Sequence, residues 1–286
     1  MSGARRIVRL LAGAVVAGFS LSGLATAAPL QQPLWEFGLG VGALAFDDYR
    51  GADTGHAYPL PVPYFVYRGR FLRADRDGIR GLLFDKEVAQ LNLSVNATTP
   101  VHSSDTPARR GMPNLRPTVE IGPSLDWHLW RSADRRLRLD LDLATRAALT
   151  VEATPHAIGW FFVPRLNLDL RDLGGQVGWN LGVLAGPLFA NRRYHQYFYE
   201  VAPQYATRDR AAYEARGGYS GVQSLVALSK RFPGYWIGAF ARYDALRGAA
   251  FAASPLVRRT GYWVGGVGIA WMIGESSRRV DAHDGP

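Results

Sequence analysis

Three side chains with catalytic potential alternate along one short stretch of the sequence: Ser124, Asp126 and His128. Residues two apart point to the same side of a β-strand, so all three would share one face. Along a strand, however, Ser124 and His128 would lie about 13 Å apart. A nucleophile and its general base need about 3 Å between them. The three therefore cannot form a triad by themselves, although His128 could still serve a nucleophile on a neighbouring strand.

The other candidates for chemistry give weaker signals. The chain has no cysteine, and its six histidines show no metal-ligand spacing. The sequence DRDG (residues 75–78) resembles the start of a calcium loop, but an EF-hand loop needs oxygen ligands at further alternating positions and a distal glutamate. The glycine-rich stretch 38–42 is not a phosphate-binding motif. We therefore expect no metal, no cofactor and no catalytic residue.

A period of two dominates the elements that would position these side chains. In residues 137–143 every odd position is leucine, whereas the even positions are Arg138, Asp140 and Asp142. A strand places those leucines on one face, but a helix would scatter them around its circumference. The same alternation recurs over residues 90–97, 118–129, 158–170 and 176–189. Runs of roughly ten residues are long enough for a tilted strand to cross a bilayer.

The two faces of these strands suit a membrane barrel better than a soluble sandwich. One face is apolar, and the other mixes charged residues, amides and glycines, as a water-filled lumen does. Sandwich strands are typically about five or six residues long. We predict an all-β fold, an antiparallel transmembrane β-barrel of about twelve strands, with ten as the alternative. The expected strands are 35–46, 58–68, 70–84, 88–97, 118–131, 137–150, 157–170, 176–189, 194–200, 218–230, 235–246 and 261–273.

The N-terminus has the features of a cleaved signal peptide. Three arginines precede an apolar run, and Ala25-Thr26-Ala27 is a cleavage site of the A-x-A type. The predicted organisation is a signal peptide over 1–27, a barrel over 28–273 and a polar, disordered tail over 274–286. Removal of the signal peptide's three arginines lowers the formal net charge from +9 to +6. This moderate excess does not demand nucleic acid, and it suits lipopolysaccharide phosphates or an acidic partner.

One long connection does not fit the expected strand order. With both termini in the periplasm, loops after odd-numbered strands face outwards and are expected to be longer. Residues 47–57, 201–217 and 247–260 obey this rule, but Thr98–Pro117 follows the fourth expected strand. Either the strand count is wrong by one, or a large loop faces the periplasm and suits a periplasmic partner. The candidate partner-binding residues in this loop are Arg109, Arg110, Met112 and Asn114.

Three stretches, in this order after a signal peptide, resemble one family of outer-membrane proteins. They are WEFGLGVGALAFDDYRGAD, YPLPVPYFVYRGRFLRADRDGIRGLLFD and ARRGMPNLRPTVEIGPSL. The chain is similar through them to the MltA-interacting protein (MipA)/OmpV family. That resemblance implies an outer-membrane barrel without catalytic residues. For the namesake branch it also implies a scaffold that joins a lytic transglycosylase to a murein synthase, a penicillin-binding protein.

The second of these stretches interrupts the regular strand pattern. Arg73, Asp75 and Asp77 fall on one parity, and Arg76 and Arg80 on the other. A lipid-facing arginine near the bilayer midplane costs roughly 2–4 kcal/mol, so a regular membrane strand cannot carry charges on both faces. We predict a bulge or bend near residues 77–78, with these charges in the lumen or at the interface.

The most consistent function is therefore a non-enzymatic outer-membrane barrel that interacts with cell-wall enzymes, as the resemblance implies. Two alternatives stay open on the residues alone. A barrel of this size has room for a narrow pore for small solutes. An outer-membrane lipid hydrolase that uses His128 is the other. The expected surroundings are outer-membrane lipid and lipopolysaccharide, with periplasmic enzymes as protein partners and no nucleic acid.

Overall fold

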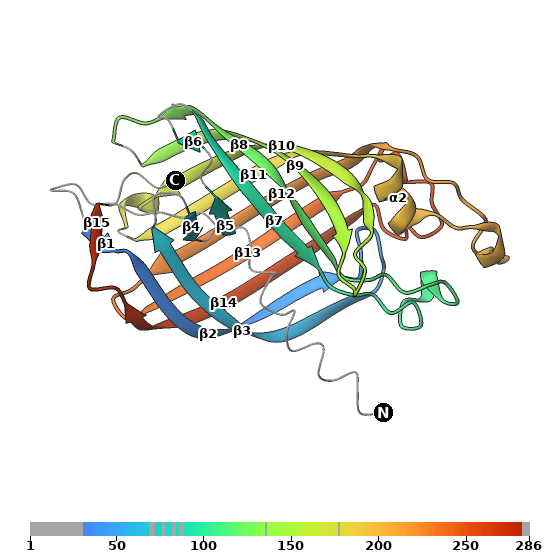
Figure 1. Ribbon diagram of the computed structural model, residues 1–286, viewed down its shortest axis with the longest axis horizontal. Helices are drawn as coiled ribbons and strands as arrows, with labels where there is room; N and C mark the ends of the chain where they lie inside the picture. The colour runs from blue at the N-terminus through green and yellow to red at the C-terminus, as the bar shows by residue number, and fades with distance from the viewer. Residues whose placement is uncertain are drawn as a thin grey trace.

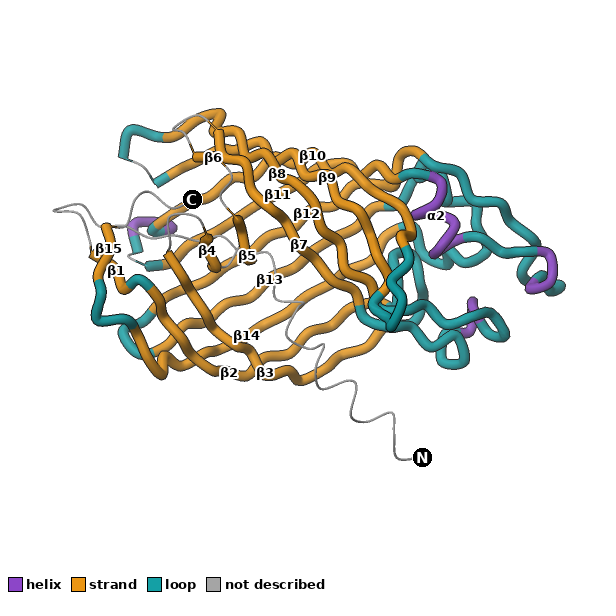
Figure 2. Tube along the Cα trace, in the orientation of Figure 1, coloured by secondary structure: helices purple, strands orange, loops and turns teal. Residues whose placement is uncertain are grey.

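The computed structural model describes residues 31–68, 72–75, 78–81, 84–85, 89–134, 136–176 and 178–281. The predicted signal peptide lies outside these residues. The described chain forms a β-barrel with long connections gathered at one end (Figures 1 and 2). Among the described residues, no helix has the length and apolar content that crossing a membrane requires.

Ten long strands of 10 to 15 residues form the wall in the described part of the chain. Except between β3 and β7, each pairs antiparallel with the next of these ten strands in sequence, and the last, β14, pairs with the first, β2. The ten are β2 (Trp35–Asp47), β3 (Gly55–Arg68), β7 (Ala89–Thr98), β8 (Thr118–Arg131), β9 (Leu137–Thr150), β10 (Ala157–Arg171), β11 (Trp179–Ala190), β12 (Gly218–Arg231), β13 (Tyr235–Ala245) and β14 (Gly261–Glu275).

Short strands connect β3 to β7, where the sequence suggested one long strand over 70–84. β4 (Leu72–Asp75) pairs antiparallel with β5 (Gly78–Gly81), so the chain reverses between Asp75 and Gly78. β6 (Phe84–Asp85) pairs with β7, and β5 also lies beside β7, which brings the two ends of the sheet together. The expectation of a single strand over 70–84 is therefore wrong.

The second wrong strand is 194–200. These residues belong to helix α2 (Arg192–Tyr199). The Asn191 side chain caps this helix, because its Oδ1 accepts a hydrogen bond from the Tyr194 backbone N–H. The stretch YHQYFY is rich in aromatic residues, which favour strands. This composition led to the prediction of a strand in place of the helix that Asn191 caps. The number of long strands is therefore ten, the stated alternative to twelve.

Removing these two strands resolves the anomaly of the connection at Thr98–Pro117. Residues 99–117 join the third long strand, β7, to the fourth, β8, so they lie at the same end as residues 48–54, 191–217 and 246–260 (Figure 2). The opposite end has short turns, at 132–136, 172–178 and 232–234. Because outer-membrane barrels have long extracellular loops and short periplasmic turns, the long-loop end is the outer end. The alternative of a large periplasmic loop over 98–117 is thus overturned.

The predicted disordered tail also needs correction over its described part. Gly274 and Glu275 complete β14, and β15 (Arg279–Asp281) pairs antiparallel with β1 (Gln31–Pro33). This small sheet lies at the short-turn, periplasmic end (Figure 1). Three short 3-10 helices complete the elements of the described residues: η1 (Pro107–Arg109), η2 (Leu173–Gly175) and η3 (Pro203–Tyr205).

The outer face of the wall is apolar and carries aromatic residues near both ends. Trp263 and Trp160 lie near the outer ends of their strands and are 66% and 50% exposed. Trp127, Trp130 and Trp271 lie near the periplasmic ends and are also about half exposed. Exposed tryptophan at both ends of an apolar wall is typical of the interfacial girdles of a membrane barrel.

Candidate functional site: a capped lumen

A charged wall covers one side of the lumen, from β7 to β10. The polar residues of the period-two pattern face inwards, as the alternation predicted. They line one cavity together with apolar residues from the remaining strands. The charged and amide side chains on this wall are Gln90, Asn92, Asn96, Glu120, Asp126, His128, Arg138, Asp140, Asp142, Arg146, Arg165 and Asn167.

Near the periplasmic end, this wall is held by a chain of ion pairs. Arg138 lies between two carboxylates, with its Nε 2.7 Å from Asp140 and its Nη2 2.9 Å from Asp169. Asp140 also accepts from the His128 ring, whose Nδ1 lies 2.8 Å from Asp140 Oδ1. Arg138, Asp140 and Asp169 are almost fully buried. Pairing offsets the cost of burying these charges, so a structural role accounts for this network.

Farther out, two carboxylates face each other across the ladder. Asp126 of β8 pairs in register with Asp142 of β9. The Ser124 hydroxyl lies 2.5 Å from one Asp142 oxygen and 3.4 Å from an Asp126 oxygen, and Arg165 forms an ion pair with Asp142. Asn92 donates to Asp126 at 2.6 Å. Donors from three neighbouring strands thus compensate two carboxylates that would otherwise repel.

These contacts give Ser124, Asp126 and His128 separate roles. Ser124 is bonded to carboxylates, and His128 is bonded to Asp140. Within the described residues, no hydroxyl or thiol forms a hydrogen bond to the His128 imidazole. A serine hydrolase needs such a bond between nucleophile and base. The described residues also contain no group of His, Asp or Glu that could hold a metal ion.

The opposite wall of the lumen is more apolar. The inward residues of β11 to β14 and β2 include Leu184, Leu225, Phe240, Val264 and Leu44, together with the polar side chains Gln223 and Arg242. The cavity between the charged and the apolar wall has a volume of about 400 Å³. Its lining includes α2 residues Tyr194 and Tyr199, so the cavity reaches the underside of the outer loops.

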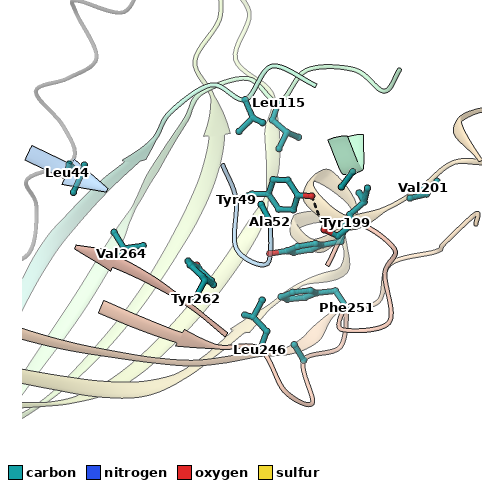
Figure 3. Packing of buried hydrophobic residues seen from close by; sticks show 14 residues of the cluster. Leu44, Tyr49, Ala52, Leu115, Tyr199, Val201, Leu246, Phe251, Tyr262 and Val264 are labelled. Carbon is teal, nitrogen blue, oxygen red and sulfur yellow. Dashed lines mark hydrogen bonds between the residues drawn. The ribbon is translucent and has the colours of Figure 1, made fainter. Parts of the chain in front are cut away.

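The outer mouth is closed by a hydrophobic cap built from four connections. Buried side chains from residues 48–54, 99–117, 191–217 and 246–260 pack in one cluster with inward residues of β2 and β14 (Figure 3). Leu246, Phe251 and Leu256 are fully buried there. The connections come from β7–β8 on one side of the barrel and β13–β14 on the other. The cap therefore bridges the mouth.

Hydrogen bonds between loops fix the cap. Tyr49 donates to the Leu256 carbonyl at 2.8 Å, and Thr106 donates to Asp48 at 2.5 Å. Arg210 is buried and donates through Nη1 to the carbonyl oxygens of Ala108 and Arg110, both at 3.0 Å. A guanidinium can satisfy several carbonyls at once because its donors form a planar fork.

The predicted partner-binding residues lie in this cap. Arg109 is buried, and its guanidinium donates to the carbonyls of Phe198 and Pro113 at 3.1 and 3.2 Å. The Asn114 side chain accepts from the Ser103 backbone N–H at 2.8 Å. Met112 packs against the cap cluster, whereas Arg110 is exposed on the outer surface. Arg109, Met112 and Asn114 thus support the loop's own structure.

The charged candidates of the interrupted stretch are only partly described. Arg73 pairs in register with Arg80, and Asp75 with Gly78, in the β4–β5 hairpin. The side chains of Arg73, Asp75 and Arg80 lie outside the described residues, as do Arg76 and Asp77 entirely. Their orientation towards the lumen stays a prediction.

Sequence reasoning missed His195, which the structure places at the centre of the cap. Its Nδ1 lies 2.5 Å from the Arg216 carbonyl and its Nε2 2.6 Å from the Ser220 hydroxyl. The Phe251 ring contacts it edge-on, 4.7 Å between centroids. Burial lowers the pKa of His195 below its usual value, which favours the neutral ring. The sequence feature that could have indicated this helix, and with it His195, is the N-cap residue Asn191, four positions before His195.

No curated protein matches the sequence. One similar structure is an outer-membrane channel from Pseudomonas putida F1, 10% identical, covering 87% of this chain and 100% of that chain at a TM-score of 0.44. A second is described as a bacterial polysaccharide outer membrane secretin, 9% identical, covering 84% and 99% at a TM-score of 0.40. A third is the outer-membrane protease OmpT from Escherichia coli, 7% identical, covering 87% and 99% at a TM-score of 0.31.

The family is identified by a sequence match. The model of the family described as MltA-interacting protein MipA matches residues 39–273, which is well over half of the 286-residue chain. The match begins within β2 and ends within β14, so it spans all ten long strands and the four connections of the cap. The chain is an outer-membrane β-barrel that belongs to the MipA family.

Proposed function

We propose that this barrel is closed to solutes and acts as an outer-membrane scaffold for peptidoglycan-remodelling enzymes. The observation that carries the proposal is the cap, because four connections from around the mouth pack into one buried cluster. A barrel that conducts needs a continuous water path, and fully buried leucine and phenylalanine side chains obstruct it. The family's description names MltA as the interacting protein, which supports a lytic transglycosylase as one partner.

The face that suits a periplasmic partner is the rim opposite the cap. It comprises the short turns at 132–136, 172–178 and 232–234 and the β1–β15 sheet. Its exposed side chains include Arg131, Arg136, Arg278 and Arg279 against Asp134 and Glu275. Four arginines against two acids favour an acidic protein surface or anionic murein. The proposed interface therefore moves from residues 98–117 to this rim.

A pull-down from envelope extract tests the scaffold. We expect the triple variant Arg136→Glu, Arg278→Glu, Arg279→Glu to lose most of the recovered transglycosylase and penicillin-binding protein. The matched control reverses three exposed arginines of the outer end, Arg110, Arg208 and Arg247, and should recover both enzymes as wild type does. If the rim variant recovered both enzymes as wild type does, the periplasmic rim would not be the interface.

Passage of small solutes is the second candidate, favoured by the continuous charged wall inside the lumen. Planar-bilayer recordings separate it from the scaffold, since the capped barrel should give no single-channel steps. Clear steps in the wild-type protein would establish the pore. Phospholipid hydrolysis that disappears in His128→Ala would instead establish the lipid hydrolase.

A further inference from the structure

Exposed arginines gather at the outer ends of four neighbouring strands. β11, β12, β13 and β14 are consecutive in the sheet. Arg193 follows the end of β11, Arg216 precedes β12, Arg247 follows β13, and Arg258 and Arg259 precede β14. All five are exposed, and none forms an ion pair with a described residue. At about 4.8 Å between strands, this group spans about 14 Å of the rim.

A row of aromatic side chains lies near the outer ends of the same four strands. Each of the same four strands contributes one: Phe189, Tyr219, Tyr243 and Trp263. Phe189 pairs in register with Tyr219, and Tyr243 with Trp263. The ring centroids are 6.0 Å apart in the first pair and 4.9 Å in the second. Such a row marks the level where acyl chains meet the polar headgroups.

The rest of the outer rim does not share this charge. In residues 191–217 and 246–260, seven arginines and two acids are exposed, a surplus of five positive charges. In residues 48–54, 99–117 and 151–156, the exposed charges are two arginines and three acids. There Arg116 also forms an ion pair with Glu152 at 3.8 Å. The positive surface is therefore confined to the side of β11–β14.

We propose that this surface, the arginine rim of β11–β14, binds the phosphate groups of lipopolysaccharide in the outer leaflet. The arginines supply planar bidentate donors for phosphate oxygens, and the aromatic row packs against the acyl chains below them. Five exposed arginines that form no ion pair within the described chain match a headgroup with more than one phosphate better than a glycerophospholipid with one. The site lies outside the barrel, so it does not depend on the lumen or the periplasmic rim.

Binding of lipid A to the purified full chain tests this site, by native mass spectrometry from detergent. The variant Arg193→Gln, Arg258→Gln, Arg259→Gln removes three positive charges from the rim. Each arginine near an anionic lipid surface contributes about fivefold in affinity, so the triple variant should bind about 100-fold more weakly. The control Arg116→Gln, Arg278→Gln, Arg279→Gln removes the same charge elsewhere and should bind as wild type does.

The choice of lipid provides the second arm of the test. Wild type should prefer bis-phosphorylated lipid A over dephosphorylated lipid A and over phosphatidylglycerol. Equal binding of all three lipids would overturn the proposal, and so would equal lipid A affinity of rim variant and control. Heat-modifiable migration in gels confirms that each variant is folded. If the triple variant does not fold, the single variant Arg258→Gln replaces it, with an expected loss of about fivefold in lipid A affinity.

Discussion

Tyr199 and Phe251 stack face to face, with ring centroids 3.7 Å apart and 3° between the ring planes. Tyr199 ends helix α2 after β11, whereas Phe251 lies in the connection after β13. Both are almost completely buried. The Tyr199 hydroxyl also donates to the Arg50 carbonyl in the β2–β3 connection at 3.0 Å. This pair thus joins three of the four connections that close the barrel.

Replacing Phe251 by alanine should open the cap while the barrel stays folded. A buried Phe→Ala change costs about 3–5 kcal/mol, from lost burial and a residual cavity. Because most of the cap's buried residues belong to the connections and not to the strand ladders, we expect local opening rather than global unfolding. Limited proteolysis should then cut residues 191–217 and 246–260 rapidly. Val226→Ala on the lipid-facing side of β12 is the control, and equal protection of both variants would contradict the prediction.

Arg210→Lys should loosen the cap even though it keeps the charge. The Arg210 guanidinium donates to the carbonyls of Tyr205, Ala108 and Arg110. One ammonium group cannot reproduce this planar fork. Losing hydrogen bonds from a charged group costs about 1.5–3 kcal/mol. Hydrogen exchange of residues 201–213 should accelerate, and exposed Arg208→Lys should leave it unchanged. Unchanged exchange in Arg210→Lys would mean that other contacts hold this loop.

The alternation of side chains was sufficient to predict most of the wall. Ten of the twelve expected strands overlap a long strand closely, because polar-in and apolar-out is a constraint on every membrane-crossing strand. The failures were 70–84 and 194–200, whose charges or aromatic residues follow no lipid-facing alternation. Each false strand shifted the strand count by one and so reversed the predicted end of the barrel for every later connection. The second error cancelled the first, so only the connections between residues 84 and 194 were assigned to the wrong end.

The cap could not be predicted in the same way. Its contacts join residues far apart in sequence, such as Arg210 with Ala108 and Tyr49 with Leu256. No period marks a loop that packs against another loop. Arg109 looked like a surface cation beside prolines, but its partners are carbonyls that only the folded cap brings together. Its role as a structural residue therefore required the structure.

The Arg165–Asp142 pair in the lumen should show strong coupling in a double-mutant cycle. Both side chains are largely buried, so removing one partner leaves an uncompensated charge. Arg165→Met should destabilise the barrel more than Asp142→Leu does, because it leaves the Asp142 carboxylate unpaired opposite the Asp126 carboxylate. We expect the double variant Arg165→Met, Asp142→Leu to lose less stability than the sum of the singles, with about 0.5–3 kcal/mol of coupling. Urea unfolding from lipid vesicles measures it, and additive losses would refute the coupling.

Acid should destabilise the cap through His195. Burial lowers its pKa below the usual 6.5, Arg50 adds to this effect, and the hydrogen bond to the Arg216 carbonyl partly opposes it. The unfolded cap therefore binds a proton at a pH where the folded cap does not. Stability is unaffected above about pH 6.5, falls as pH drops below that value, and levels off once His195 is protonated in the folded cap.

Proteolysis of residues 191–217 between pH 5 and 8 checks this prediction. Wild type should become more susceptible towards pH 5, after correction for the protease's own pH dependence. His195→Gln keeps polar atoms near Ser220 but cannot titrate, so its susceptibility should be higher at pH 8 and nearly independent of pH. His156→Gln, an exposed histidine at the same end, is the control and should follow wild type. A pH response that persists in His195→Gln would assign the acid sensitivity to another group.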